Sequence, residues 1–198
     1  MNSSSSEKFT QQTGASVIWV TGLSGAGKTT LCAAVQRKLK PLMPELLVFD
    51  GDGVRGALSQ GLGYSEEERI LQFHRMHALV DLVASQGMVV VAGSLYSNPE
   101  LSAWNRASLP GYFEVYLKSS LETVTRRDSK GLYAKASKGE MSDVVGVDIP
   151  YLDPPEPDLV FDMDNPMSPD EMADVLIASA PRLAVHAEQA RLRNTSAQ

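Results

Sequence analysis

The sequence is poor in the features that mark secreted, membrane-spanning and nucleic-acid-coating proteins. It contains one cysteine, Cys32, which excludes an intramolecular disulfide framework and a multi-cysteine zinc site. No apolar run approaches the ~20 residues that a membrane-spanning helix needs. Its net charge of −6 argues against a nucleic-acid coat, which requires surplus cations. Residues 1–12 are rich in Ser and Gln and lack the apolar core of a secretory signal. We therefore expect a soluble cytoplasmic protein whose partners include neither membrane nor nucleic acid.

Short apolar segments with the β-branched composition of buried strands alternate with helical patterns. The predicted strands are residues 16–21, 46–49, 88–92, 112–118 and 158–162. The predicted helices are residues 29–42, 65–85, 121–128 and 168–185. Two of these helices begin with a capping box, formed by Ser65 with Glu68 and by Ser168 with Glu171. This alternation predicts an α/β fold, a five-stranded parallel sheet flanked by helices, which binds ligands at the carboxyl ends of its strands.

The chain divides into one domain and two polar ends. We expect a disordered arm over residues 1–15, a domain over residues 16–186 and a polar tail over residues 187–198. Residues 129–157 are rich in Gly, Lys, Pro and Asp and show little periodicity. Because so long a connection is rarely idle in a compact domain, we predict that this lid segment is a mobile loop that closes over a site.

The first predicted strand runs directly into a glycine-rich loop. Residues 22–29 read GLSGAGKT, which matches the phosphate-binding pattern G-x-x-x-x-G-K-[ST] between a strand and a helix. The N–H groups of such a loop surround phosphate oxygens, the lysine binds the β- and γ-phosphates and the threonine hydroxyl binds Mg²⁺. We expect the Lys28 ammonium to face solvent until phosphate binds. The predicted nucleotide-binding residues are Gly22, Ser24, Gly25, Ala26, Gly27, Lys28, Thr29 and Thr30.

Two carboxylates follow the second predicted strand. By itself, Asp50-Gly51-Asp52 is most often a surface turn. Residues two apart on an extended segment share a side, so Asp50 and Asp52 can also face one site. Beside a phosphate-binding loop, carboxylates serve Mg²⁺ and a hydroxyl acceptor, and we favour that interpretation.

Six motifs together resemble the adenylylsulfate (APS) kinase family and follow one another in that family's order over residues 16–160. They are residues 22–30, Asp50-Gly51-Asp52 with Arg55, Leu62-Gly63-Tyr64-Ser65 with Arg69, Arg127-Asp128, Lys130-Gly131-Leu132-Tyr133 and residues 146–151. The resemblance implies a P-loop NTPase fold with ATP and Mg²⁺ as cofactors. It implies transfer of the ATP γ-phosphoryl group to the 3′-hydroxyl of adenosine 5′-phosphosulfate, which gives PAPS.

The resemblance also assigns roles to individual residues. Thr29 and Asp50 would hold Mg²⁺, Arg127 would bind ATP, and Asp52 would orient the acceptor hydroxyl. The catalytic residues would be Lys28, Asp50, Asp52 and Lys130. The acceptor nucleotide would be bound by Asp52, Arg55, Tyr64, Arg69, Gln72, Ser97, Lys130, Leu132 and Val144. We expect the enzyme to be a homodimer.

The sequence departs from the family pattern around the acceptor. Where the family clamps the adenine between two phenylalanines, this chain has Tyr64 and Val144, and only the first supplies an aromatic face. Gln72 stands where the family has a shorter asparagine. Residues 103–106 and 110–116 are similar to a branch that contains a cytidine diphosphoramidate kinase. A cytidine nucleotide is therefore an alternative acceptor, and a regulatory ATP-binding subunit without turnover is a second alternative.

Overall fold

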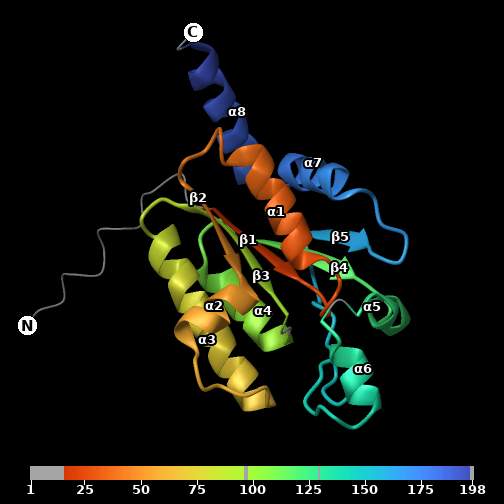
Figure 1. The fold of residues 1–198 in the computed structure, drawn as a ribbon. Helices are drawn as coiled ribbons and strands as arrows, with labels where there is room; N and C mark the ends of the chain where they lie inside the picture. The colour runs from red at the N-terminus through yellow and green to blue at the C-terminus, as the bar shows by residue number, and fades with distance from the viewer. Residues whose placement is uncertain (1–15, 96–97, 129, 197–198) are drawn as a thin grey trace, which may run out of the picture.

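Five parallel strands form a single sheet in the computed structural model, which describes residues 16–95, 98–128 and 130–196. The strands are β1 (Ser16–Thr21), β2 (Leu46–Asp50), β3 (Val89–Ser94), β4 (Phe113–Lys118) and β5 (Leu159–Asp162). Their order across the sheet is β2-β3-β1-β4-β5, so β1 lies at the centre (Figure 1). The register places Val20 of β1 between Gly93 of β3 and Val115 of β4. This arrangement confirms the predicted fold class.

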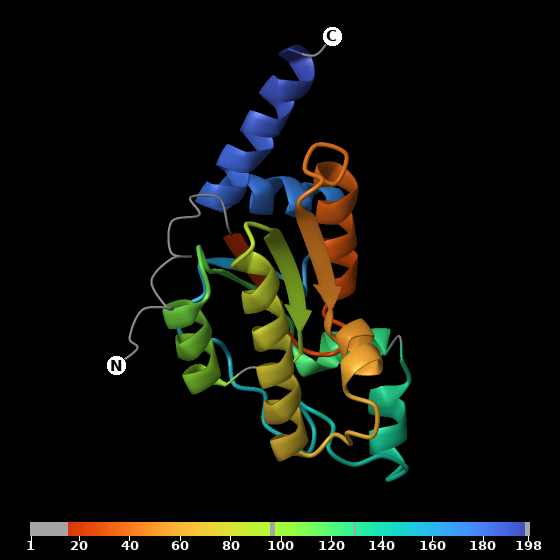
Figure 2. The same cartoon turned by 90° about the vertical axis from the view of Figure 1, so that its left-hand side faces the viewer.

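Helices cover both faces of the sheet. They are α1 (Lys28–Leu39), α2 (Gly51–Leu58), α3 (Glu66–Ala84), α4 (Pro99–Ser108), α5 (Leu121–Arg127), α6 (Leu132–Ser137), α7 (Pro169–Ser179) and α8 (Pro181–Ser196). Figure 2 shows α3 and α4 over one face, with α1 and α7 on the other. No helix in the described part of the chain has the length and apolarity needed to cross a membrane.

Alternating side chains along the central strand separate two apolar clusters. Ile18 and Val20 belong to the larger cluster, which also contains apolar residues of α1, α7 and α8. Val17 and Trp19 point to the other face, where they join apolar residues of α2, α3 and α4. Because both faces of the sheet are buried, its strands read as continuous apolar runs rather than as alternating polar and apolar residues.

The predicted strands and the helices predicted over residues 29–42, 65–85 and 121–128 are confirmed within a few residues. Both capping boxes form: the Ser65 hydroxyl accepts the Glu68 N–H, and the Ser168 hydroxyl accepts the Glu171 N–H. The helix expected over residues 168–185 is instead two helices, because α7 ends before Pro181, which lacks the N–H that would continue it. The helix α8 extends to Ser196, through most of the expected polar tail.

Alanine at helical spacing explains why α8 was missed. Among the residues of this helix whose burial is described, Leu183, Ala187 and Ala190 are buried. Beyond the expected end at residue 185 these are alanines, whose small side chains give a weak apolar signal. The Asp50-Gly51-Asp52 segment is extended only at Asp50, which ends β2 and is the N-cap of α2. The expectation of a turn or an extended segment is wrong for Asp52, which lies in the first turn of that helix. The expected arm over residues 1–15 lies outside the described residues.

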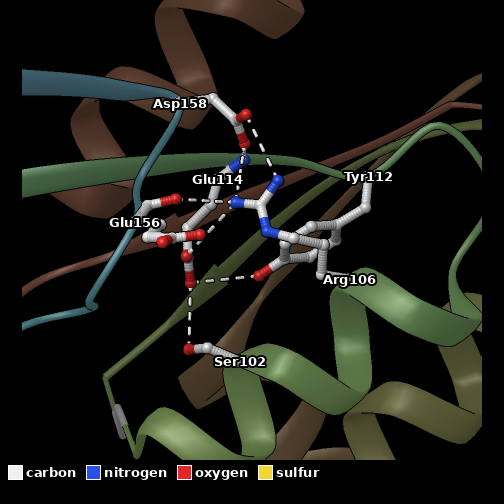
Figure 3. A network of polar contacts seen from close by, with 6 residues as sticks. All are labelled: Ser102, Arg106, Tyr112, Glu114, Glu156 and Asp158. Atoms are coloured by element: carbon white, nitrogen blue, oxygen red, sulfur yellow. Dashed lines mark hydrogen bonds and ion pairs between the residues drawn. The ribbon is translucent and has the colours of Figure 1, made fainter.

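The lid segment contains more structure than its composition indicated. It includes the helix α6 and a β-bridge between Val145 and Ile149. The side chains of Val145 and Ile149 are buried. At the far end of the segment, Arg106 of α4 binds the Asp158 carboxylate and the Glu156 carbonyl, beside the buried Glu114 of β4 (Figure 3). This network attaches the chain that leaves the lid segment to α4 and to the beginning of β4.

Candidate active site

One cavity of about 1020 Å³ lies at the carboxyl ends of β1, β2 and β3. Its wall is formed by the phosphate loop, by α2 and α3, by the lid segment and by the beginning of α7. The predicted site residues in this wall are Ser24, Gly25, Ala26, Gly27, Lys28, Thr29, Thr30, Asp50, Asp52, Arg55, Tyr64, Arg69, Gln72, Arg127, Lys130, Leu132 and Val144. Gly22 is absent from the wall, and Ser97 lies outside the described residues.

Glycine is required in the phosphate loop for two separate reasons. Gly25 and Gly27 have φ angles of 79° and 106°, in the left-handed region that residues with a side chain rarely adopt. Gly22 packs so tightly that a Cβ atom there would lie 2.8 Å from the Leu117 carbonyl oxygen. The loop then enters α1, whose first N–H groups carry no intrahelical partner and can therefore bind phosphate oxygens.

Lys28 is half-buried in the cavity wall, and its ammonium is bound by its own loop rather than free in solvent as the sequence suggested. It donates hydrogen bonds to the Gly22 carbonyl at 2.7 Å and to the Leu23 carbonyl at 2.8 Å. Burial, followed by the positive charge of Lys130, lowers the pKa of Lys28 from its ordinary value of 10.5 to about 8. Lys28 is thus held against its own loop, and binding of a phosphate would require it to exchange two carbonyl partners for phosphate oxygens.

Thr29 and Asp50 form a pair of oxygen donors suited to Mg²⁺. The Thr29 hydroxyl donates to Asp50 Oδ1 at 2.8 Å, across the gap between α1 and the end of β2. Mg²⁺ binds through one or two protein oxygens and completes its octahedron with water and phosphate oxygens. A hydroxyl and a carboxylate that already touch, next to a phosphate loop, therefore fit this ion.

An ion pair joins the second carboxylate to the lid segment. The Lys130 ammonium binds Asp52 Oδ2, although the two residues are 78 positions apart in the sequence. Asp52 projects from the first turn of α2, and Lys130 lies directly before Gly131, the N-cap of α6. The contact brings a cation of the lid segment to the carboxylate that the sequence assigned to the acceptor hydroxyl.

Two guanidinium groups lie over the Tyr64 ring. The Arg55 carbon Cζ is 4.5 Å from the ring centroid, and that of Arg69 is 5.4 Å from it. Arg55 also donates to the Gly63 carbonyl, and Arg69 donates to the Asp143 carbonyl of the lid segment at 2.6 Å. A positive, aromatic-lined surface of this kind suits an anionic nucleotide, since it offers both charge and a stacking face.

Gln72 and Val144 complete this side of the cavity. Ser59, which sequence analysis did not single out, donates its hydroxyl hydrogen to Gln72 Oε1, while Gln72 Nε2 is buried with no hydrogen-bond partner among the described residues. Val144 is 5% exposed, and its N–H donates to Asp148 Oδ2 at 3.1 Å. The structure therefore places Val144 in the cavity wall, as predicted, and gives it an aliphatic rather than an aromatic surface.

A group of methionines lines the opposite end of the cavity. Met163, Met167 and Met172 come together there, and Arg127 donates to the Met163 carbonyl at 2.6 Å. No sequence motif connects these methionines, and only the fold of the segment after β5 brings them to one cavity. Flexible apolar side chains such as these adapt well to the flat face of a nucleotide base.

The fold and the cavity define the class of protein: a P-loop kinase with a phosphate-binding side and an acceptor side. The family model described as adenylylsulphate kinase matches residues 14–162. The chain therefore belongs to the adenylylsulfate kinase family.

Relatives and solved structures agree with this assignment. The chain is 39% identical over 169 residues to the adenylyl-sulfate kinase of Chloroflexus aurantiacus, with 85% of this chain and 90% of the relative covered. It is 37% identical over 151 residues to the adenylyl-sulfate kinase of Oceanobacillus iheyensis, covering 75% and 76%. The Mycobacterium tuberculosis APS kinase in complex with AMPPNP and APS superimposes with a TM-score of 0.76 at 35% identity, covering 83% of this chain and 96% of that one.

Proposed function

We propose that this protein is an ATP-dependent kinase that phosphorylates the 3′-hydroxyl of adenosine 5′-phosphosulfate and so produces PAPS. The observation that carries the proposal is the shared cavity. Its wall contains the phosphate loop with Lys28, the Tyr64 surface with Arg55 and Arg69, and the Asp52 carboxylate in the first turn of α2. Membership of the adenylylsulfate kinase family supports the choice of substrates.

The chain's own residues supply positioning and charge for the transfer. Lys28 moves from its loop carbonyls to the β- and γ-phosphates, and Arg127 lies at the nucleotide end of the cavity. Thr29 and Asp50 hold Mg²⁺, which neutralises phosphate charge when bound. Asp52 accepts the proton of the 3′-hydroxyl as the oxygen forms its bond to the γ-phosphorus, and the bond from that phosphorus to the ADP oxygen breaks. Lys130 stabilises the charge on the transferring oxygens.

We further propose that the lid segment closes over both nucleotides and excludes water. Its residue Lys130 lines the cavity and binds Asp52, its helix α6 is short, and its residue Tyr133 donates to the Ser24 carbonyl of the phosphate loop. We also propose a cytoplasmic homodimer, with the single cysteine consistent with a reducing compartment. Light scattering after size exclusion tests the dimer against the monomer mass of 21.4 kDa.

A cytidine nucleotide is the second candidate acceptor. The observation that favours it is the aliphatic surface that Val144 contributes to the cavity wall, where the family has a second phenylalanine to stack on adenine. A smaller pyrimidine ring needs less stacking surface than adenine does, and an edge hydrogen bond from Gln72 would help to recognise it.

A coupled assay of ADP release with several acceptors separates these functions. Turnover with adenosine 5′-phosphosulfate that disappears in Lys28→Ala, while the circular dichroism spectrum is retained, supports the proposal. Preferred turnover with cytidine diphosphate analogues would transfer it to the alternative acceptor. ATP binding without ADP release for any acceptor would contradict both kinase functions and would support a regulatory ATP-binding subunit.

A further inference from the structure

A hydrogen bond joins the lid segment to the phosphate loop. The Tyr133 hydroxyl, in the first turn of α6, donates to the Ser24 carbonyl at 3.1 Å. The Tyr133 side chain is 4% exposed and does not line the cavity. Burial, followed by the charge of Asp128, raises the pKa of Tyr133 to about 12, so the hydroxyl remains a donor at physiological pH.

A second contact between the same two segments lies one residue away in the loop. Gly146 has a φ of 93°, and a Cβ atom there would lie 3.1 Å from the Leu23 side chain and 3.3 Å from that of Leu121. The Leu23 carbonyl accepts a hydrogen bond from Lys28 at 2.8 Å. Two consecutive residues of the phosphate loop are thus held in place. Leu23 is contacted by Gly146 of the lid segment and by Lys28, and Ser24 is bound by Tyr133.

A turn that Asp128 closes contains Lys130 and leads into α6. The Asp128 carboxylate accepts the N–H groups of Tyr133 at 3.2 Å and Ala134 at 2.9 Å, and the Asp128 carbonyl accepts the Gly131 N–H at 2.9 Å. Gly131 has a φ of 65°, which suits the left-handed bend into α6. Because three hydrogen bonds close the turn, anchoring Tyr133 also determines where the Lys130 backbone lies.

We propose that Tyr133 is a positioning residue, which places Lys130 against Asp52 by anchoring α6 to the Ser24 carbonyl. This inference rests on the proposed kinase function, in which Lys130 meets the transferring phosphoryl group and Asp52 meets the acceptor hydroxyl. The anchor connects the donor side of the cavity with its acceptor side through four residues of the lid segment. Tyr133 touches neither nucleotide and acts through Lys130.

A matched pair of tyrosine substitutions tests the role of the hydroxyl. Tyr133→Phe is expected to lower kcat about three- to tenfold, the effect of one lost hydrogen bond, with both KM values changed less than about twofold. Tyr112→Phe is the control, because the Tyr112 hydroxyl also donates a 3.1 Å hydrogen bond, to Glu114 at the beginning of β4, and neither residue lines the cavity. This substitution is expected to leave kcat unchanged. Equal effects of the two substitutions on kcat would overturn the proposal.

A double-mutant cycle tests whether Tyr133 acts through Lys130. In the Lys130→Ala background, Tyr133→Phe is expected to cause no further loss of kcat, because the group that it positions is already gone. Losses that multiply would show that Tyr133 acts independently of Lys130 and would overturn the inference.

Hydrogen exchange gives a readout that needs no turnover. AMPPNP alone is expected to slow amide exchange over residues 131–138 in the wild-type protein, and Tyr133→Phe is expected to abolish that protection. An exchange rate over these residues that is the same with and without AMPPNP would overturn the coupling between the phosphate loop and α6. Failure of the wild-type enzyme to phosphorylate adenosine 5′-phosphosulfate would contradict the proposed function instead, and the exchange result would stand on its own.

Discussion

Arg106 is the cation that faces the buried carboxylate of Glu114, and its replacement by methionine tests how the lid segment is attached to the sheet. Arg106 donates to both Asp158 carboxylate oxygens, at 3.2 and 2.9 Å, and to the Glu156 carbonyl at 2.9 Å. Its guanidinium is also 3.7 Å from Glu114 Oε2 (Figure 3). Methionine keeps most of the aliphatic packing and removes all four polar contacts.

The expected loss follows from what remains around Glu114. Removing one partner of a buried ion pair costs about 3–5 kcal/mol, because the other charge is left without compensation. Glu114 is 2% exposed but keeps the hydroxyls of Ser102 and Tyr112 as donors, and the Arg106 side chain is 37% exposed. These features lower the expected loss in the free energy of unfolding to about 2–3 kcal/mol.

Urea unfolding followed by circular dichroism measures this loss. Arg37→Met is the control, since Arg37 forms a surface pair with Asp170 in which both side chains are more than half exposed, and a loss below about 1 kcal/mol is expected there. In Glu114→Gln, which has no buried charge to leave uncompensated, Arg106→Met is expected to cost less. A loss for Arg106→Met no larger than the control's, or one unchanged by Glu114→Gln, would refute the reasoning.

The pH dependence has a defined sign. Burial raises the pKa of Glu114 above its ordinary value of 4.5. At a pH between the pKa of the unfolded state and the higher pKa of the folded state, the folded state therefore holds a proton that the unfolded state has released. Stability therefore falls as pH rises through this window. Removing the Arg106 cation raises this pKa further, so Arg106→Met is expected to cost less at pH 5 than at pH 7.5. An equal loss at the two pH values would argue that Glu114 ionisation is not involved.

Three further predictions concern the cavity. Asp52→Asn is expected to lower kcat about a hundredfold or more with little change in ATP affinity, because it removes a proton acceptor. If ATP affinity falls instead, Asp52 is a metal ligand. Trypsin is expected to cut the lid segment more slowly when AMPPNP and the acceptor are both bound, and equal cleavage rates would count against closure. Val144→Phe is expected to raise the kcat/KM ratio of the adenine acceptor to the cytidine acceptor about tenfold, as one added stacking ring would. An unchanged ratio would place residue 144 outside the base-binding surface.

Local sequence was sufficient where short-range chemistry decides the structure. Gly25 and Gly27 are needed for the φ angles of the phosphate loop, so its motif and its place between β1 and α1 follow from consecutive residues. The capping boxes at Ser65 and Ser168 mark helix starts for the same reason, since each is complete within four residues. The strands of a sheet covered on both faces can also be predicted locally, because each is a continuous run of apolar residues.

Only the tertiary structure decided the features that depend on contacts distant in sequence. Asp50-Gly51-Asp52 reads locally as a turn, but it begins α2, and its register depends on packing of Val54 against the sheet. Lys28 looked exposed in sequence, yet its environment depends on the loop carbonyls and on Lys130, more than a hundred residues later. Met163, Met167 and Met172 likewise line the cavity only because the chain after β5 folds back against it. Sequence motifs record which groups the chemistry needs, whereas long-range packing determines how those groups are charged, oriented and brought together.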